Sequence, residues 1–333
     1  MSKRTIYKLI ALLLGCTFLA LFVGQIDFQL VSLHLTKVGW QFVWLLLVSG
    51  SAYLMATIAW YLCLPNATHL SLFQLFNYRL IGETLAVINP TNIIGGESAK
   101  IYLLKKAGVA YKAGVTSILL SRILIMLSMV ALFLLLPFGL IDPSVNIGTF
   151  GNYLWPLFVL VLFFVSIFLA FVHPSLWLFR ALRYLAKRLD YPFLHKMLPK
   201  VEEINELMAT FYQRYRGRLV LAFWLSFFHW IMGAVEMYLI LSFLGIKITL
   251  WKAILLEVGI TCFKSMGAFI PGQIGVEEYG NKLMLTLAGI SGGSTWVVVS
   301  ILRRTRQLFW LGLGCLSCLL IYPKLTKVEP QTV

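Results

Sequence analysis

The sequence predicts an all-α polytopic membrane protein in which six full spans and two re-entrant helical hairpins form an inverted repeat. Of its 333 residues, 60% are hydrophobic and only 12% are charged, which excludes an ordinary soluble protein. Two polar, proline-containing segments, residues 88–97 and 269–278, interrupt the apolar runs. The net charge of +15 comes from basic residues scattered between apolar spans, so it indicates membrane topology and not nucleic-acid binding.

The two interrupting segments repeat each other at a fixed distance along the chain, which we call the repeat offset. The same offset relates four landmarks: Pro90 to Pro271, Glu97 to Glu278, Ala107-Gly108 to Ala288-Gly289, and Arg122 to Arg303. Four matches at one offset favour two copies of one unit over coincidence. We therefore expect one transmembrane domain over residues 1–333 that contains repeat one (72–138), cytoplasmic amphipathic helices (173–216) and repeat two (250–322).

The chain begins with two apolar segments long enough to cross a bilayer, because about 20 apolar residues span the hydrocarbon core. The first, Tyr7–Gly24, follows a basic start, which predicts a cytoplasmic N-terminus. No small-residue cleavage site follows it, so we expect a retained span and not a removed signal peptide. The second, Val38–Leu62, carries tryptophans toward its ends, where aromatic rings favour the membrane interface.

Repeat one is expected to begin with a hairpin that enters and leaves the membrane on the cytoplasmic side. Leu72–Val87 is apolar, a break follows at Asn89-Pro90, and Glu97–Lys106 is expected as a short helix that leads out to several lysines. Irregular backbone at membrane depth is tolerated only where it is buried in protein or lines a wet cavity. The apolar run Val115–Phe138 then crosses outward.

The expected orientation follows from two loops of opposite character. Residues 139–152 contain no lysine or arginine, whereas residues 173–218 contain nine. Between them, Tyr153–Val172 is expected to return the chain to the cytoplasm, since an excess of basic residues marks that side. In the basic loop we expect an amphipathic helix at 178–189 on the surface of the inner leaflet, with a second at about Val201–Tyr212.

Repeat two follows the span Gly217–Gly245, which is expected to cross outward. Its hairpin, Leu250–Ile290 with Pro271-Gly272 at the tip, therefore enters from the outside, and Ser294–Tyr322 brings the C-terminus into the cytoplasm. Three crossings separate the two hairpins, and an odd number inverts one repeat relative to the other. Both polar tips should therefore meet near the middle of the membrane.

Ionisable side chains inside these apolar segments need a compensating role, because each costs roughly 2.5 to 3.5 kcal/mol on membrane insertion. A guanidinium in a wet intramembrane cavity suits the capture of a phosphate by two hydrogen bonds. The candidate phosphate-binding residues are Arg122, Lys264, Arg303, Arg304 and Arg306. The candidate residues of the hairpin tips and of gating are Asn89, Pro90, Asn92, Gly95, Gly96, Glu97, Pro271, Gly272, Gln273, Gly275, Glu277 and Glu278.

A purely structural interpretation of these residues stays open. Intramembrane charges also pair with one another, and a carboxylate at the start of a helix is favoured by the helix dipole. The sequence shows no catalytic or metal-binding pattern, since the five histidines are dispersed and the pair Cys315 and Cys318 lacks partners that would complete a zinc site. We therefore expect no cofactor, no metal and no enzymatic activity.

Residues 90–97 and 271–278 resemble the motifs of a known family, the second in the form Pro-Gly-x-x-Gly-x-x-Glu. Over nearly its whole length the chain is similar to the flippase-like transmembrane domain of the lysylphosphatidylglycerol synthase family, which is also found in hopanoid- and glycolipid-associated membrane proteins. The first motif departs from the pattern, because residues 89–92 read Asn-Pro-Thr-Asn where Pro-Gly is more usual.

The resemblance implies a bacterial inner-membrane protein that moves an anionic or modified lipid between leaflets and binds its head group in a central polar cavity. A phospholipid, an aminoacyl-lipid and a polyprenyl-phosphate glycolipid all remain candidates. The family's soluble aminoacyl-transferring domain has no counterpart after Tyr322, so its enzymatic activity is not implied. Two alternatives stay open: an accessory protein that presents a lipid to a lipid- or glycan-synthesis enzyme docked on the helix 178–189, and a membrane-embedded transferase.

Overall fold

The computed structural model confirms the all-α prediction for the part of the chain that it describes, where most residues lie in helices and none lies in a strand. The described residues are 36, 38–65, 70–88, 93–139, 199, 203, 206–267, 273, 275–290 and 295–326. Three predicted features lie outside them: the spans Tyr7–Gly24 and Tyr153–Val172 and the amphipathic helix 178–189. Of the second amphipathic helix, residues 203 and 206–212 are described and helical.

Three helices in the described part are long and apolar enough to cross a membrane. They are α3 (Phe42–Leu62), which continues the short 3₁₀ helix η1 (Gly39–Gln41), together with α6 (Tyr111–Gly139) and α10 (Arg216–Phe243). All three were predicted as spans, with bounds that agree to within four residues. Large apolar side chains cover their outer faces, and Trp40 in η1 is 73% exposed. Such a surface suits contact with lipid chains.

The first helix pair consists of α4 (Leu72–Ile88) and α5 (Ile93–Lys106), which pack against each other. α4 ends one residue before Asn89, as the helix-breaking Asn-Pro sequence predicts. α5 begins four residues before Glu97, so it is longer than the sequence analysis expects.

The early start of α5 changes the role of two glycines. Gly95 and Gly96 lie in the first turn of α5 and not in the connection that precedes it. A Cβ atom on Gly96 would collide with the carbonyl oxygen of Gly82 in α4 and would lie 2.9 Å from the Cβ atom of Ala86. Gly96 is therefore required for the close approach of the two helices, which a turn-based interpretation does not predict.

The second helix pair consists of α11 (Leu250–Met266) and α12 (Val276–Leu287), and it also packs closely. Gly275, the residue before α12, has a φ angle of +84°, which an L-amino acid with a side chain adopts only with strain. Gly259 of α11 lies so close to Met284 of α12 that a Cβ atom would collide with the methionine side chain. Glycine therefore fixes both the turn and the packing of this pair.

The same hydrogen-bonded motif ends both helix pairs. Gly108 and Gly289, each the second residue after α5 and α12, adopt φ angles of +85° and +74°. The bonds that close the motif are Val109 N–H to the Leu104 carbonyl at 3.0 Å and Ile290 N–H to the Leu285 carbonyl at 2.9 Å. Helices commonly end in this way, but here the two copies stand at the repeat offset that relates the sequence motifs.

The last helix, α13 (Thr295–Thr326), packs against both helix pairs, through α4 and through α12. Its second half fits closely onto α4, because a Cβ atom on Gly314 would collide with Thr84. Nearby, the Ser317 hydroxyl donates a hydrogen bond of 2.8 Å to Asn77 Oδ1.

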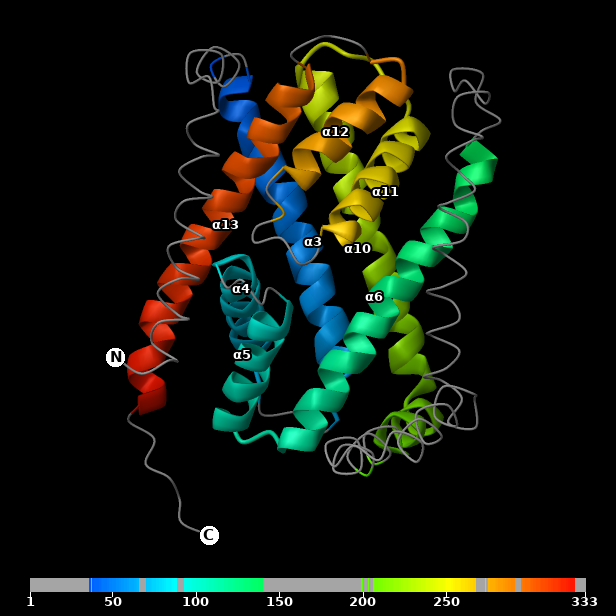
Figure 1. The fold of residues 1–333 in the computed structure, drawn as a ribbon. Helices are drawn as coiled ribbons and strands as arrows, with labels where there is room; N and C mark the ends of the chain where they lie inside the picture. The colour runs from blue at the N-terminus through cyan, green and yellow to red at the C-terminus, as the bar shows by residue number, and fades with distance from the viewer. Residues whose placement is uncertain are drawn as a thin grey trace, which may run out of the picture.

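The helix pairs occupy opposite halves of the bundle. Figure 1 shows α4 and α5 in the lower half and α11 and α12 in the upper half, with the C-terminal ends of α4 and α11 directed toward the middle. α10 packs along α3 and also contacts α6 and α11. Buried apolar side chains that include Met237, Leu256 and Leu285 form a core between α10, α11 and α12. Polar side chains gather where the two pairs face each other.

Candidate functional site

Charged side chains inside the helices form two networks of ion pairs, one at each helix pair. The first network contains Arg79 and Glu83 of α4, Glu97 and Lys100 of α5, and Arg122 of α6. Lys100 Nζ lies 3.2 Å from Glu97 Oε1 and 3.5 Å from Glu83 Oε1. Arg122 Nε donates a hydrogen bond of 2.8 Å to Glu97 Oε1. This network ties both helices of the first pair to the span α6.

The second network surrounds Arg303 of α13, whose side chain is 3% exposed. Arg303 donates a hydrogen bond of 2.6 Å to Glu257 Oε2 of α11 and one of 3.4 Å to Asn281 Oδ1 of α12. Its Nε lies 3.7 Å from Glu277 Oε1. The Asn281 amide in turn donates to the Ser300 hydroxyl at 2.9 Å. Arg303 thus joins three helices in a buried polar core.

Arg304 binds the connection between α11 and α12. Its Nε donates a hydrogen bond of 2.8 Å to Glu278 Oε1, and its Nη2 donates one of 3.3 Å to the carbonyl of Gln273, whose φ angle is +53°. The other carboxylate oxygen of Glu278 accepts a bond of 2.7 Å from Gly275 N–H at the start of α12. Arg304 therefore fixes the turn of the second pair on α13.

The geometry corrects the pairing of arginines between the two repeats. The repeat offset relates Arg122 to Arg303, but the contacts of Arg122 are reproduced by Arg304. Arg122 Nε donates to Glu97, and Arg304 Nε donates to the repeat-related Glu278, both at 2.8 Å. The second repeat therefore has one additional residue between the glutamate and the arginine that binds it.

Arg306 and Lys264 complete the second network. Arg306 Nε lies 2.8 Å from Glu236 Oε1 of α10, and Lys264 Nζ lies 3.3 Å from Glu277 Oε1. The contact of Arg306 with Glu236 is an ion pair and not a hydrogen bond, because neither Arg306 Nε nor Glu236 Oε1 has a hydrogen-bond partner among the described residues. The guanidinium of Arg306 therefore keeps donors that could bind an anion.

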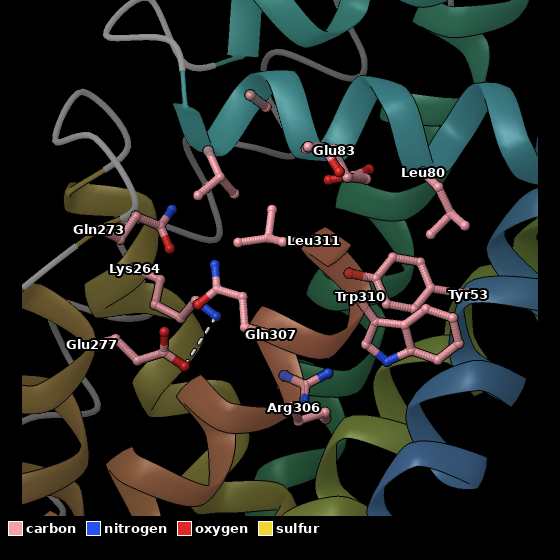
Figure 2. Close-up of a pocket in the computed structure, with 13 residues that line it drawn as sticks. Tyr53, Leu80, Glu83, Lys264, Gln273, Glu277, Arg306, Gln307, Trp310 and Leu311 are labelled. Carbon is pink, nitrogen blue, oxygen red and sulfur yellow. Dashed lines mark hydrogen bonds and ion pairs between the residues drawn. The ribbon is translucent and has the colours of Figure 1, made fainter. Parts of the chain in front are cut away.

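A polar cavity of about 220 Å³ lies between the two helix pairs, α3 and α13. Its lining residues are Tyr53, Leu80, Glu83, Thr84, Ala86, Val87, Lys264, Gln273, Glu277, Arg306, Gln307, Trp310 and Leu311. Figure 2 shows Glu83 on the α4 side of the cavity and Arg306 on the α13 side, with Lys264 and Glu277 close together. Both repeats therefore contribute charged groups to the cavity, with Lys264 and Glu277 paired and Glu83 and Arg306 on separate helices.

The structure divides the predicted phosphate-binding residues into two groups. Lys264 and Arg306 line the cavity. Arg122, Arg303 and Arg304 do not line it, and their guanidinium groups pair with carboxylates of the two networks.

The predicted tip residues divide in the same way. Gln273 and Glu277 line the cavity, whereas Glu97 and Glu278 bind arginines beside it. Gly95 and Gly96 lie in α5, and Gly275 lies before α12. The residues Asn89, Pro90, Asn92, Pro271 and Gly272 lie outside the described part of the chain.

Several residues that shape the site were not predicted from the sequence. Tyr53 and Trp310 line one wall with ring centroids 5.0 Å apart, and the Trp310 indole N–H donates a bond of 2.9 Å to the Ser49 hydroxyl of α3. An aromatic residue in an apolar helix carries no signal of such a role. Arg79 did carry one, because it precedes Glu83 by four residues, and their side chains form an ion pair at 3.6 Å.

Within the described residues, no group of three or more histidine, cysteine, aspartate or glutamate side chains could hold a metal ion. Cys63, Cys262, Cys315 and Cys318 are free thiols there. The polar chemistry of the described site is therefore that of paired guanidinium, ammonium and carboxylate groups.

The fold and the site define a multi-pass helical membrane protein with a polar cavity between its helix pairs. The chain belongs to the lysylphosphatidylglycerol synthase family, because it matches the family model described as the lysylphosphatidylglycerol synthase TM region over residues 8–314. The match confirms the resemblance seen in the motifs. Comparisons with curated proteins and with solved structures found no match.

Proposed function

We propose that the protein moves an anionic or modified lipid between the two leaflets of the cytoplasmic membrane, with the lipid head group in the cavity. The observation that carries this proposal is the position of Lys264 and Arg306 in a polar cavity inside a bundle of membrane-spanning helices. Intramembrane cations are costly, and those that face a wet cavity commonly mark a substrate pathway. Membership of the family supports a lipid-related role.

Arg306 is proposed as the main ligand of the head-group phosphate. Its Nε lies 2.8 Å from Glu236 Oε1 in an ion pair that is not a hydrogen bond, and in this proposal its guanidinium donates two parallel hydrogen bonds to phosphate oxygens. Lys264 adds a positive charge without a fixed geometry, and 29% of its side chain is exposed. Gln307, which also lines the cavity, can donate from its side-chain amide.

The size of the cavity limits what enters it. About 220 Å³ is smaller than the roughly 300 to 1,000 Å³ of sites that enclose a drug-sized molecule. A head group with one phosphate fits this space, whereas an oligosaccharide does not fit without a rearrangement of the helices. The acyl or prenyl chains would remain in the lipid between the spans.

In this proposal the two helix pairs are re-entrant hairpins of opposite orientation among six full spans, and both chain termini are cytoplasmic. The opposite placement of the pairs in Figure 1 supports this arrangement. The contacts of Glu97 with Arg122 and of Glu278 with Arg304 would hold the two hairpins in the conformation described here. Release of one contact at a time would open the cavity to one side. No chemical step is assigned to the chain.

The proposal is tested by mass spectrometry of the lipids that stay bound after gentle extraction. The native protein is expected to retain a specific phosphate-containing lipid, and Arg306→Gln is expected to lose it. Arg214→Gln is the matched control, because Arg214 is an exposed arginine outside the cavity. Arg306→Gln leaves Glu236 buried without its partner, so the double variant Arg306→Gln/Glu236→Gln keeps the site neutral and separates lost binding from lost folding.

Retention of the same lipid by the folded double variant would remove Arg306 from the proposed site. If the native protein carries only bulk phospholipid in membrane proportions, the head-group site is not in this cavity. In vesicles, the native protein should move the retained lipid between leaflets. Specific binding without movement would instead favour the accessory role, in which the lipid is presented to a partner enzyme.

A further inference from the structure

The first ion-pair network contains more positive than negative charge. Its three cations are Arg79, Lys100 and Arg122, and its two carboxylates are Glu83 and Glu97, so one positive charge is left over. Among the described residues, these two glutamates are the carboxylates that pair with the three cations. Arg79 and Lys100 are buried, whereas the side chain of Arg122 is 36% exposed. A surplus charge that is largely buried is costly unless a counter-ion offsets it.

The second network provides an internal comparison. It contains four cations and four carboxylates, so its charges cancel. The position that corresponds to Lys100 at the repeat offset is Asn281, a neutral amide that is completely buried and binds Arg303. The surplus is therefore a property of the first repeat and not of the repeat unit.

Arg79 has hydrogen-bonding capacity that the protein does not use. Its residue exposure is 7%, and its Nε has no hydrogen-bond partner among the described residues. Arg79 Nη2 forms an ion pair of 3.6 Å with Glu83 Oε1, and its guanidinium carbon lies 5.7 Å from the centroid of the Tyr53 ring. A buried N–H group without a partner costs roughly 1 to 3 kcal/mol, and more when the group is charged.

All three cations line one small void, which is separate from the larger cavity. The lining residues are Trp60, Arg79, Glu97, Lys100, Ile118, Ser121, Arg122 and Ile125. Its volume of about 10 Å³ is close to the minimum for a single water-sized occupant. This void is far smaller than the cavity of about 220 Å³, so it suits a small anion better than a lipid head group.

From the surplus charge, the unused N–H of Arg79 and the void that the three cations share, we infer that repeat one binds a single monatomic anion, such as chloride, between Arg79, Lys100 and Arg122. The anion neutralises the network, accepts the hydrogen bond that Arg79 lacks and strengthens the attachment of α4 and α5 to α6. A water molecule would satisfy the N–H but would not offset the charge. The network shares Glu83 with the lining of the larger cavity, but its three cations do not line that cavity.

The test measures thermal unfolding of the purified protein in detergent while sodium gluconate is replaced stepwise by sodium chloride or sodium bromide at fixed ionic strength. Ligand binding to the folded state raises its stability, so the native midpoint should rise by a few degrees and saturate. Lys100→Met and Arg79→Gln should each abolish this saturable halide dependence. Lys282→Gln, which removes an exposed lysine elsewhere in the structure, should retain it.

A second measurement uses the native protein alone, so it does not depend on how well the variants fold. Crystals grown in bromide should show an anomalous peak between Arg79, Lys100 and Arg122. Identical native midpoints in gluconate and chloride would overturn the inference, and so would a halide dependence that survives in both Arg79→Gln and Lys100→Met. An anomalous map without a peak in the void would overturn it as well.

Discussion

Replacing Arg303 by methionine should destabilise the protein strongly without acting directly on the cavity. Arg303 and its partner Glu257 have side-chain exposures of 3% and 8%, and their ion pair measures 2.6 Å. Removal of one member of a buried pair leaves the other charge buried without compensation, which costs about 3 to 5 kcal/mol. Arg303→Met should therefore lower the free energy of unfolding by about that amount. Glu277 also faces Arg303, but it keeps Lys264 as a partner at 3.3 Å.

The assay is equilibrium unfolding in mixed micelles, with lipid retention measured on the same samples. The double variant Arg303→Met/Glu257→Met should recover most of the lost stability, because replacing both members of a buried pair by apolar residues of similar volume is often neutral. It should also retain lipid, since neither residue lines the cavity. A loss below about 1 kcal/mol in Arg303→Met would refute the role of the pair. A stable double variant that fails to bind lipid would place Arg303 in the site after all.

Two further substitutions test the packing and the turn. Gly96→Ala should lower the free energy of unfolding by about 1 to 3 kcal/mol, because the new methyl group collides with the Gly82 carbonyl. Gly312→Ala is the control and should have little effect, because a methyl group there meets nothing within 4 Å. Equal unfolding midpoints for the two variants would contradict the close packing of α4 and α5. Arg304→Lys keeps the charge but removes the guanidinium that binds both Glu278 and the Gln273 carbonyl. The free energy of unfolding should therefore fall by about 2 kcal/mol, measured by equilibrium unfolding. Native stability in this variant would argue against the role of the guanidinium in holding the turn.

The helix order of the described part could be predicted because it depends on local signals. Apolar runs of sufficient length predicted the three described spans to within a few residues. The Asn89-Pro90 dipeptide predicted the end of α4. The start of α5 could not be predicted in this way. Gly95 and Gly96 are weak helix formers, and their place in the helix depends on contact with Gly82 in another helix.

The candidate site was predictable in composition but not in pairing. The repeat offset and the cost of intramembrane charge identified Lys264 and Arg306, which line the cavity, and also Arg303, which does not. The difference between Arg303 and Arg306 depends on which carboxylate each guanidinium meets, and those carboxylates lie on α11 and α10. Contacts between distant segments leave no pattern in one sequence. For the same reason, the repeat offset points to Arg303 as the counterpart of Arg122, whereas the structure shows that Arg304 binds Glu278.

The position of α13 has a mechanical consequence. At one level Arg304 binds the turn of the second pair, and farther along Gly314 and Ser317 fit closely onto α4 of the first pair. Between these levels Trp310 is bonded to α3. α13 therefore links the two helix pairs, and a displacement of either pair is transmitted along this helix to the other. Release of the contact that holds one pair is therefore expected to change the position of the other pair as well.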